Sequence, residues 1–111
     1  MPTTFNNAQV QLSTTSITDV YQAPATAGNT AVVMSIMVAN VDGTASADIT
    51  ISKTSSANSL QSHLAFTVPV PADTSLEVVA TRIVLLAGEK IRATASAAND
   101  LHVTVSALEN T

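Results

Sequence analysis

Apolar and polar residues alternate along several short runs of this chain. In ADITIS (47–52), KIRATAS (90–96) and LHVTVSAL (101–108), every second residue is Ala, Ile, Leu or Val, and most residues between them are polar. A period of two belongs to a strand, whose successive side chains point to opposite faces. The pattern predicts half-buried β-strands and limits the fold to packed sheets.

Turn-forming residues separate such runs at intervals of roughly 10 to 15 residues, a spacing typical of antiparallel sandwiches. We therefore predict an all-β fold, an antiparallel, jelly-roll-like β-sandwich of about eight strands. One turn, AAND (97–100), contains Asn99, a residue that tolerates left-handed backbone. The expected strands lie near Val10, Val20, Val33, Ile49, Phe66, residues 78–86, Ile91 and Val103.

The chain has 111 residues, which is enough for one domain with its own core. No linker, repeat or charge block divides it, so we expect a flexible or extended N-terminal arm over residues 1–9 and a single β-sandwich domain over residues 10–111. No apolar run is long enough to span a membrane as a helix. The N-terminus has neither the basic nor the apolar region of a signal peptide, so we expect no membrane partner and no Sec export.

The run TAVVMSIMVANV (30–41) is apolar on both of its predicted faces. One face carries Val32, Met34, Ile36 and Val38, and most residues of the other face are also apolar. Such a strand is covered on both sides, either by the domain's own second sheet or by a neighbouring subunit. The residues alone leave both options open. The opposite face is our candidate subunit interface: Ala31, Val33, Met37 and Ala39.

Asp42-Gly43 follows this run directly. Because Asp and Gly tolerate the positive φ angles of a type I′ turn, we expect a hairpin between residues 38 and 52. Further along, the alternation in HLAFTVPV (63–70) places Phe66 on the inner face. Pro69 has no amide hydrogen, so this strand is expected at a sheet edge or leaving the ladder.

The segment TSLEVVATRIVLLAG (74–88) permits two predictions. Thr74 and Glu77 have capping-box spacing, and Gly88 is a suitable helix C-cap. The β-branched residues and the β-rich flanks favour strand, in one piece or two. We predict strand and keep a short helix over residues 75–87 as the alternative.

Composition restricts the functional classes. The chain has no Cys, which excludes a disulfide framework, a thiolate zinc site and a thiol nucleophile. Four basic residues against eight acidic ones do not form the basic surface that nucleic acid requires. Lys90 and Arg92, with Arg82 nearby in sequence, are expected on a solvated strand face, although an acidic partner surface would also suit them.

Few residues are candidates for chemistry. Ser62, His63 and Asp73 would be needed for a hydrolase triad, but no nucleophile-elbow motif surrounds them. His63 and His102 fall on outward faces, where a metal site would need several subunits. We therefore predict no catalytic residue, no metal site and no cofactor.

Two other groups have ordinary structural explanations. Asn40, Asp42 and Asp48 lack the ligand spacing of a calcium-binding loop. With one Tyr and no Trp, the chain cannot present the platform of rings that binds sugars. Tyr21 is expected to be a half-buried strand residue.

Three stretches together resemble a group of small virion proteins of tailed bacteriophages, notably marine and cyanobacterial phages. The shared patterns are an N-V-x-G-x-x-x-A-D-hydrophobic stretch, a P-V-P-A-D-x-x-L-E segment, and an L-x-x-G-D/E-x-I-R-A-x-A-S strand pair with a V-S-x-L-E tail. They are matched by VANVDGTASADITIS (38–52), HLAFTVPVPADTSLEVV (63–79) and LLAGEKIRATASAANDLHVTVSALE (85–109).

The resemblance implies a structural component of the virion, assembled in the host cytoplasm, with no catalytic residues to transfer. We expect a non-enzymatic capsid decoration or cement protein that stabilises the particle through subunit contacts. The expected partners are further copies of the chain, a trimer being favoured, and the major capsid or neck and tail proteins. Alternatives are a neck, collar or tail-fibre module and, in a different class, a glycan- or metal-binding β-sandwich.

Overall fold

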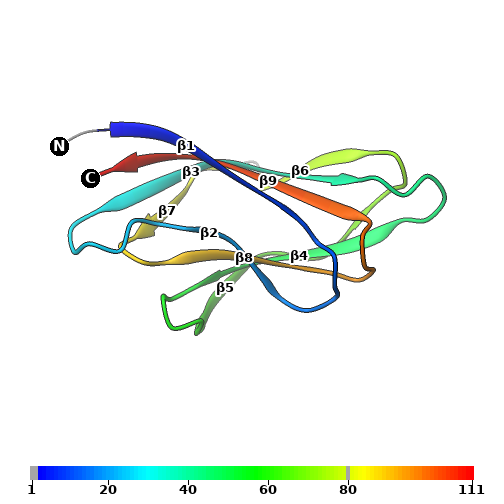
Figure 1. The fold of residues 1–111 in the computed structure, drawn as a ribbon, viewed down its shortest axis with the longest axis horizontal. Coiled ribbons are helices and arrows are strands. Elements are labelled where there is room, and N and C mark those ends of the chain that lie inside the picture. Colours follow the sequence, from blue (N-terminus) through cyan, green and yellow to red (C-terminus); the bar gives the residue numbers. More distant parts are fainter. Residues whose placement is uncertain (1–2, 80) are drawn as a thin grey trace.

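The computed structural model describes residues 3–79 and 81–111, which form two packed antiparallel sheets (Figure 1). Within these residues there are nine strands and no helix long and apolar enough to cross a membrane. The strands are β1 (Thr3–Gln11), β2 (Thr18–Gln22), β3 (Thr30–Asn40), β4 (Ala47–Thr54), β5 (Leu60–Val70), β6 (Ser75–Val79), β7 (Ile83–Leu86), β8 (Lys90–Ala95) and β9 (Leu101–Asn110). The predicted all-β sandwich is confirmed.

The strand order is that of a jelly roll. Sheet A has the order β1-β9-β3-β6, with β7 also paired with β3, and sheet B has the order β2-β8-β4-β5. β7 and β6 follow each other along one edge of β3, where Ile83 lies opposite Val33 and Val79 lies opposite Ile36. They are two parts of one interrupted strand, so the nine strands fill eight positions.

β6 and β7 show that the segment over residues 75–87 forms strands, as predicted, and not the alternative short helix. Residue 80 of this segment lies outside the described residues. The strand conformation is favoured because both β6 and β7 pair with β3 and carry β-branched residues. Val79 and Leu85 from these strands are buried in the core between the sheets.

In the strands with unbroken alternation, the side chains point to the faces that the sequence predicts. Pairing between β4 and β8 is regular from Ile49 opposite Ala95 to Thr54 opposite Lys90. The apolar member of each alternating pair therefore faces the other sheet. These side chains form much of the core: Ala47, Ile49, Ile51, Ile91, Ala93, Ala95, Leu101, Val103, Val105 and Ala107.

β3 contradicts the predicted division into two faces. Its pairing with β9 is irregular between Val33 and Ser35, and an extra residue there reverses the alternation. Ala31 and Val33 before the irregularity, and Ile36 after it, are all 0% exposed in the core.

The four predicted interface residues therefore do not share a face. Ala31 and Val33 are covered by the domain's own second sheet, whereas Met37 is 45% exposed and Ala39 is partly exposed. The grouping is wrong because alternation cannot be continued across a bulge. A role for Met37 and Ala39 in subunit contacts stays a prediction.

β5 differs from its predicted alternation for the same reason. Its residues opposite Ile49 and Ile51 are Val68 and Ala65, so β5 has one residue more than β4 in this interval. Phe66, predicted on the inner face, is instead 64% exposed. The expectation for Pro69 is confirmed, because β5 is an edge strand of sheet B.

Asp42-Gly43 does not form a hairpin. β3 belongs to sheet A and β4 to sheet B, so the link between them crosses from one layer to the other. Neither residue has a positive φ, and the predicted type I′ turn is wrong. The left-handed backbone expected at Asn99 is confirmed by its φ of 66°.

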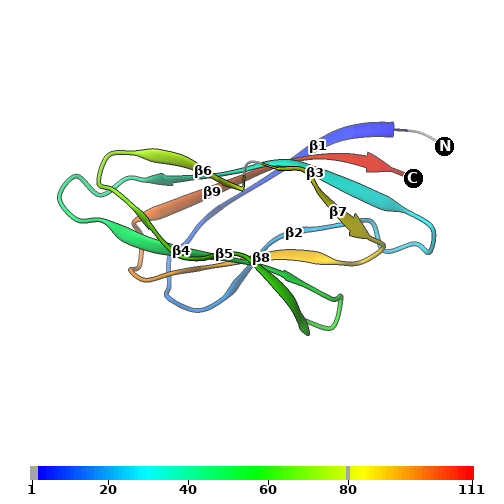
Figure 2. The same ribbon diagram turned by 180° about the vertical axis from the view of Figure 1, so that it is seen from behind.

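The expected N-terminal arm is extended, but it belongs to the sandwich. Thr3–Gln11 pairs with β9, with Thr3 opposite Asn110, so the predicted boundary at residue 10 falls inside a strand. Residues 1–2 of the expected arm lie outside the described residues. β1 and β2 border one open side of the sandwich, and β5 and β6 border the other, as the view from behind shows (Figure 2).

Candidate assembly surfaces

An apolar row crosses the outer face of sheet A. Phe5 of β1 lies opposite Leu108, Leu108 lies opposite Val32, and Val32 lies opposite Val84 of β7. Directly opposed residues of antiparallel strands project to the same face. Four strands therefore contribute one continuous row, here called the outer apolar row: Phe5, Leu108, Val32 and Val84.

Both ends of the outer apolar row are open to solvent. Phe5 is 74% exposed and Val84 is 55% exposed, and Leu86 on the same face of β7 is 58% exposed. A shallow depression beside Phe5 is lined in part by Met34 and Ser106. Leu108 and Val32 between the ends are partly exposed, and a contiguous apolar strip of this kind is typical of a site of protein contact.

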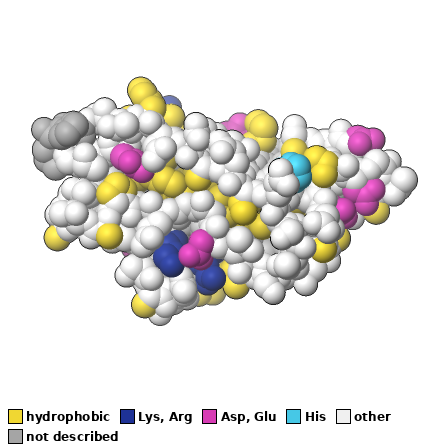
Figure 3. Space-filling view, viewed as in Figure 1, with side chains coloured by type: hydrophobic (Ala, Val, Ile, Leu, Met, Phe, Trp, Pro, Cys, Tyr) yellow, Lys and Arg dark blue, Asp and Glu magenta, His cyan; other side chains and the backbone are white. Residues whose placement is uncertain are grey.

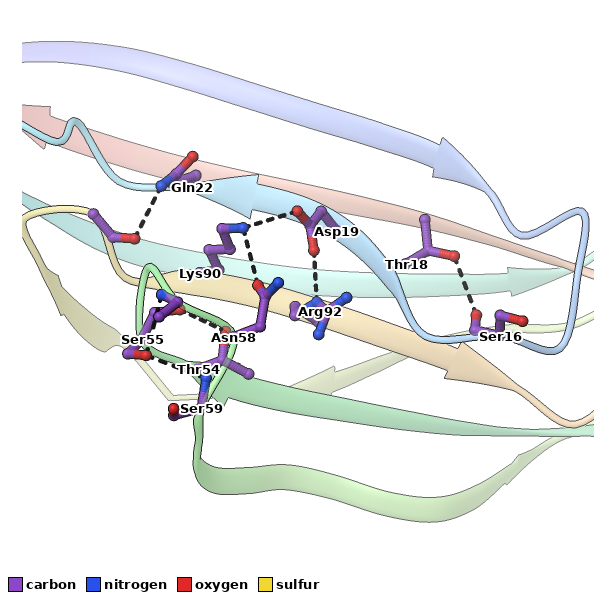
Figure 4. A network of polar contacts seen from close by, with 12 residues as sticks. Ser16, Thr18, Asp19, Gln22, Thr54, Ser55, Asn58, Ser59, Lys90 and Arg92 are labelled. Atoms are coloured by element: carbon purple, nitrogen blue, oxygen red, sulfur yellow. Dashed lines mark hydrogen bonds and ion pairs between the residues drawn. The ribbon is translucent and has the colours of Figure 1, made fainter.

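Sheet B presents a different outer face, on which Asp19, Lys90 and Arg92 are paired with each other (Figure 4). Asp19 of β2 accepts from Arg92 Nε at 2.6 Å and from Lys90 Nζ at 3.1 Å. Lys90 also donates to Asn58 Oδ1 at 3.0 Å. The hydrogen bond from Lys90, then that from Arg92, hold the pKa of Asp19 below its ordinary value, although partial burial opposes them.

Lys90 and Arg92 are therefore less solvated than the sequence predicts. Their side chains are only 12% and 16% exposed, and their charges are balanced in part by Asp19. Figure 3 shows basic and acidic side chains in contact on the lower layer of that view. This pairing weakens the alternative of an acidic partner surface. Arg82 lies apart from the pair, at an exposed position just before β7.

A second cluster closes one end of the sandwich. Glu89 accepts from Lys53 Nζ at 3.1 Å, from the Leu86 backbone N–H at 2.8 Å and from Gln61 Nε2 at 3.0 Å. Burial raises the pKa of Glu89, but these donors together lower it below its ordinary value. The carboxylate thereby ties β4 and β5 to the turn before β8.

Tyr21 connects the two sheets. Its hydroxyl donates to Glu109 Oε2 at 2.5 Å, and Asn6 Nδ2 donates to the same oxygen at 3.1 Å. Burial, and then the Glu109 carboxylate, raise the pKa of Tyr21. Tyr21 is only 6% exposed, so it is more deeply buried than predicted.

The three residues that a hydrolase triad would need, Ser62, His63 and Asp73, are not brought together. Asp73 follows the end of β5, whereas His63 lies near its beginning, roughly 23 Å away along the strand. His63 Nδ1 instead lies 3.2 Å from Ser52 Oγ, and Ser52 is 2% exposed. The His63 ring packs against Phe66, with ring centroids 4.9 Å apart.

The metal candidates are also separated. His63 is on sheet B and His102 on sheet A, and the described residues contain no group of three or more His, Cys, Asp or Glu that could hold an ion. Asn40 and Asp42 serve the link between β3 and β4: Asp42 Oδ1 accepts from Thr44, and Asn40 Oδ1 accepts from the Asp42 backbone.

No family model matches the chain, and no curated protein matches it. One solved structure similar to this chain is that of Bacillus endospore appendages, described as a novel family of disulfide-linked pili. The two share a TM-score of 0.57 over 98% of this chain and 88% of that chain, at 11% identity. The likeness is one of fold alone.

Sequence reasoning missed the outer apolar row. Phe5 lies in the expected N-terminal arm, and nothing in the local pattern marks Val84 or Leu108 as its neighbours. The signal lies in strand pairing between residues that are far apart in the chain. Only Phe5 offered a hint, as a large ring within a polar stretch.

Proposed function

We propose that this chain is a non-enzymatic structural subunit of a protein particle, specifically a capsid decoration protein of a tailed-phage virion. The observation that carries the proposal is the outer apolar row, which leaves Phe5 and Val84 more than half exposed at its ends. The resemblance to small virion proteins supplies the class of particle. A subunit of this kind acts by burying surface, so it needs no catalytic group.

In this proposal, the outer face of sheet A contacts the major capsid protein or a neighbouring copy. Transfer of apolar surface out of water contributes about 25 cal/mol for each Å² buried. The outer face of sheet B is the less suitable contact surface, because Lys90 and Arg92 there are already paired with Asp19. A neck, collar or tail-fibre position is the alternative location.

A second candidate is a subunit of a pilus-like filament. It is favoured by the fold shared with the Bacillus endospore appendages, which are disulfide-linked pili. This chain has no Cys, so a filament of it would be held by non-covalent contacts. Electron microscopy of the assembled material would distinguish a filament from a decorated shell.

The proposal is tested by adding the purified chain to virions that lack it and measuring co-sedimentation. Val84→Asp places a charge in the outer apolar row and should weaken binding at least about tenfold, because an unpaired carboxylate resists burial. The control is Ser62→Asp, an exposed position on β5 of sheet B, away from the outer face of sheet A, which should bind like the wild type. Equal binding of both variants, or absence of the chain from intact particles by mass spectrometry, would refute the proposal.

A further inference from the structure

β1 is an unprotected edge strand. All nine of its residues pair with β9 in one regular register, from Thr3 opposite Asn110 to Gln11 opposite His102. The strand, TTFNNAQVQ, contains no charged residue and no Pro. Natural sheet edges are normally blocked by charge, Pro, bulges or short length, because a bare edge recruits another strand.

The other edges of the described sheets carry such devices. β5 contains Pro69 and is irregular at several points of its pairing with β4. β2 is irregular after Asp19, whose carboxylate holds two cations beside the strand. β6 and β7 are short, with five and four residues. β1 is thus the edge on which strand addition meets least resistance.

The free hydrogen-bonding groups of β1 can be assigned. Leu12 N–H donates to Leu101 O at 2.9 Å, so even-numbered residues direct their backbone groups toward β9. Asn7 N–H is instead satisfied by Asn6 Oδ1 at 2.8 Å, which places it on the free edge. By alternation, the backbone groups of Thr3, Phe5, Asn7, Gln9 and Gln11 face outward.

The inner flank of this edge is apolar. Ala8 and Val10 of β1, and Val20 of β2, are only partly buried against the core. β1 and β2 lie on the same open side of the sandwich, where Figure 3 shows hydrophobic side chains along the line between the two layers. A strand added to β1 would cover this line as well as the backbone.

We propose that β1 pairs antiparallel with β1 of a second copy of this chain, about a twofold axis at Asn7, so that two copies of sheet A become one continuous sheet. An uncharged strand meets its own copy without repulsion, even though each chain carries a net charge of −4. Twofold contacts between identical surfaces are also the commonest form of self-association. The inference deepens the proposed assembly function and rests on it.

The register follows from the hydrogen-bonding pattern. Outward backbone groups must meet outward groups, so odd-numbered residues face odd-numbered ones. Pairing of the whole strand then sets Thr3 opposite Gln11, Phe5 opposite Gln9 and Asn7 opposite Asn7 of the second copy. The bond from Asn7 N–H to Asn6 is exchanged for a bond of the new ladder. This contact yields a dimer in place of the expected trimer.

Disulfide trapping tests the register, because the chain has no Cys of its own. Asn7→Cys should form a covalent dimer under mild oxidation, since residues opposite each other in a ladder lie within disulfide reach. Gln11→Cys is the matched control on the same strand, because in the proposed dimer it lies roughly 26 Å from its own copy. Mixed Thr3→Cys and Gln11→Cys chains should cross-link with each other, and neither should do so alone.

The pairing of β1 with β1 of a second copy is here called the seam. A second variant tests the seam separately from binding to a particle. Asn7→Lys places two like charges at the axis and should convert the dimer to monomer in sedimentation while leaving the circular dichroism spectrum unchanged. A wild-type chain that is monomeric at high concentration, or equal cross-linking of Asn7→Cys and Gln11→Cys, overturns the seam. If the seam fails but the chain still binds particles through the outer apolar row, the proposed function survives. Loss of particle binding in Val84→Asp with an intact β1 dimer would support both.

Discussion

Asn40 shows how one buried polar residue shapes the link between layers. It is 3% exposed, and its Nδ2 donates to Ala45 O at 3.0 Å and to Val70 O at 2.9 Å. Its Oδ1 accepts from the Asp42 backbone at 2.9 Å. A single amide thereby satisfies the backbone on both sides of the crossing from β3 to β4. The side-chain oxygens of Asn40 and Asp42 thus accept hydrogen bonds from the backbone of the link itself.

Asn40→Ala should therefore destabilise the fold by about 2–3 kcal/mol, because buried carbonyl and N–H groups lose their partners. Urea unfolding followed by circular dichroism measures the change. Asn29→Ala, in the loop before β3, serves as the control and should change the free energy of unfolding by less than about 0.5 kcal/mol. A similar midpoint for the two variants would show that Asn40 does not support the crossing.

At the scale of the strand, the position of an irregularity decides which side chains reach the core. Phe66 is the larger residue, yet it lies outside, whereas Val70 of the same strand is 0% exposed. Thr67 between them has a φ of 49°, which reflects the local distortion of the strand. Hydrophobicity alone would assign both residues to the core.

Two matched substitutions in β5 test this assignment. Phe66→Ser should cost less than about 1 kcal/mol, since the ring is largely in solvent already. Val70→Ser should cost about 2–4 kcal/mol, because it removes buried apolar volume and introduces a hydroxyl. Thermal or urea unfolding of the two variants gives the comparison. The reverse order would mean that β5 is regular and that Phe66 packs inside.

The predictions from sequence succeeded where a strand's alternation is unbroken. Ile49, Ile91 and Val103 were placed correctly because β4, β8 and β9 keep their own alternation throughout. β3 and β5 failed because an extra residue reverses the alternation and has no signature in hydrophobicity. The hairpin at Asp42-Gly43 failed because a turn signal does not say which sheet the next strand will join.

The candidate surface could be predicted still less. Val84 becomes a neighbour of Phe5 only through two intervening strands, and each of those pairings joins distant parts of the chain. The apolar character of Met37 and Ala39 predicts a contact surface, and both residues do lie on the exposed side of β3. Regular alternation would place Ala31 and Val33 on the same face as Met37 and Ala39. The bulge in β3 reverses the alternation between the two pairs.

At the scale of the whole molecule, the two sheets are joined by a phenol and a carboxylate as well as by the core. Tyr21 projects from sheet B and Glu109 from sheet A. Both burial and the neighbouring negative charge oppose ionisation of the phenol, which raises its pKa above the ordinary value of 10. Ionisation of Tyr21 is thus coupled to the separation of the layers.

The stability of the protein should consequently fall as the pH rises above 10. Below that value the phenol is protonated in both states, and its contribution is complete. Above it, the unfolded chain releases the proton while the folded chain retains it, which favours unfolding. Because Tyr21 is the single tyrosine, tyrosinate absorbance reports it directly.

Tyrosinate should appear together with loss of the folded circular dichroism signal. Tyr21→Phe removes this titration and should flatten the alkaline dependence of the melting temperature, although it loses one hydrogen bond. Glu109→Gln should lower the pH at which tyrosinate appears. Ionisation of Tyr21 near pH 10 in a chain that is still folded would contradict the coupling.

The pairing of Thr3 with Asn110 places the start of β1 beside the end of β9, on neighbouring antiparallel strands. Tension applied to these ends would load the hydrogen bonds between β1 and β9 one after another, like a zipper, instead of shearing them all at once. A domain with this geometry yields at low force when it is pulled by its ends. Any particle that relies on it for mechanical strength has to transmit load through the faces and edges of the sheets.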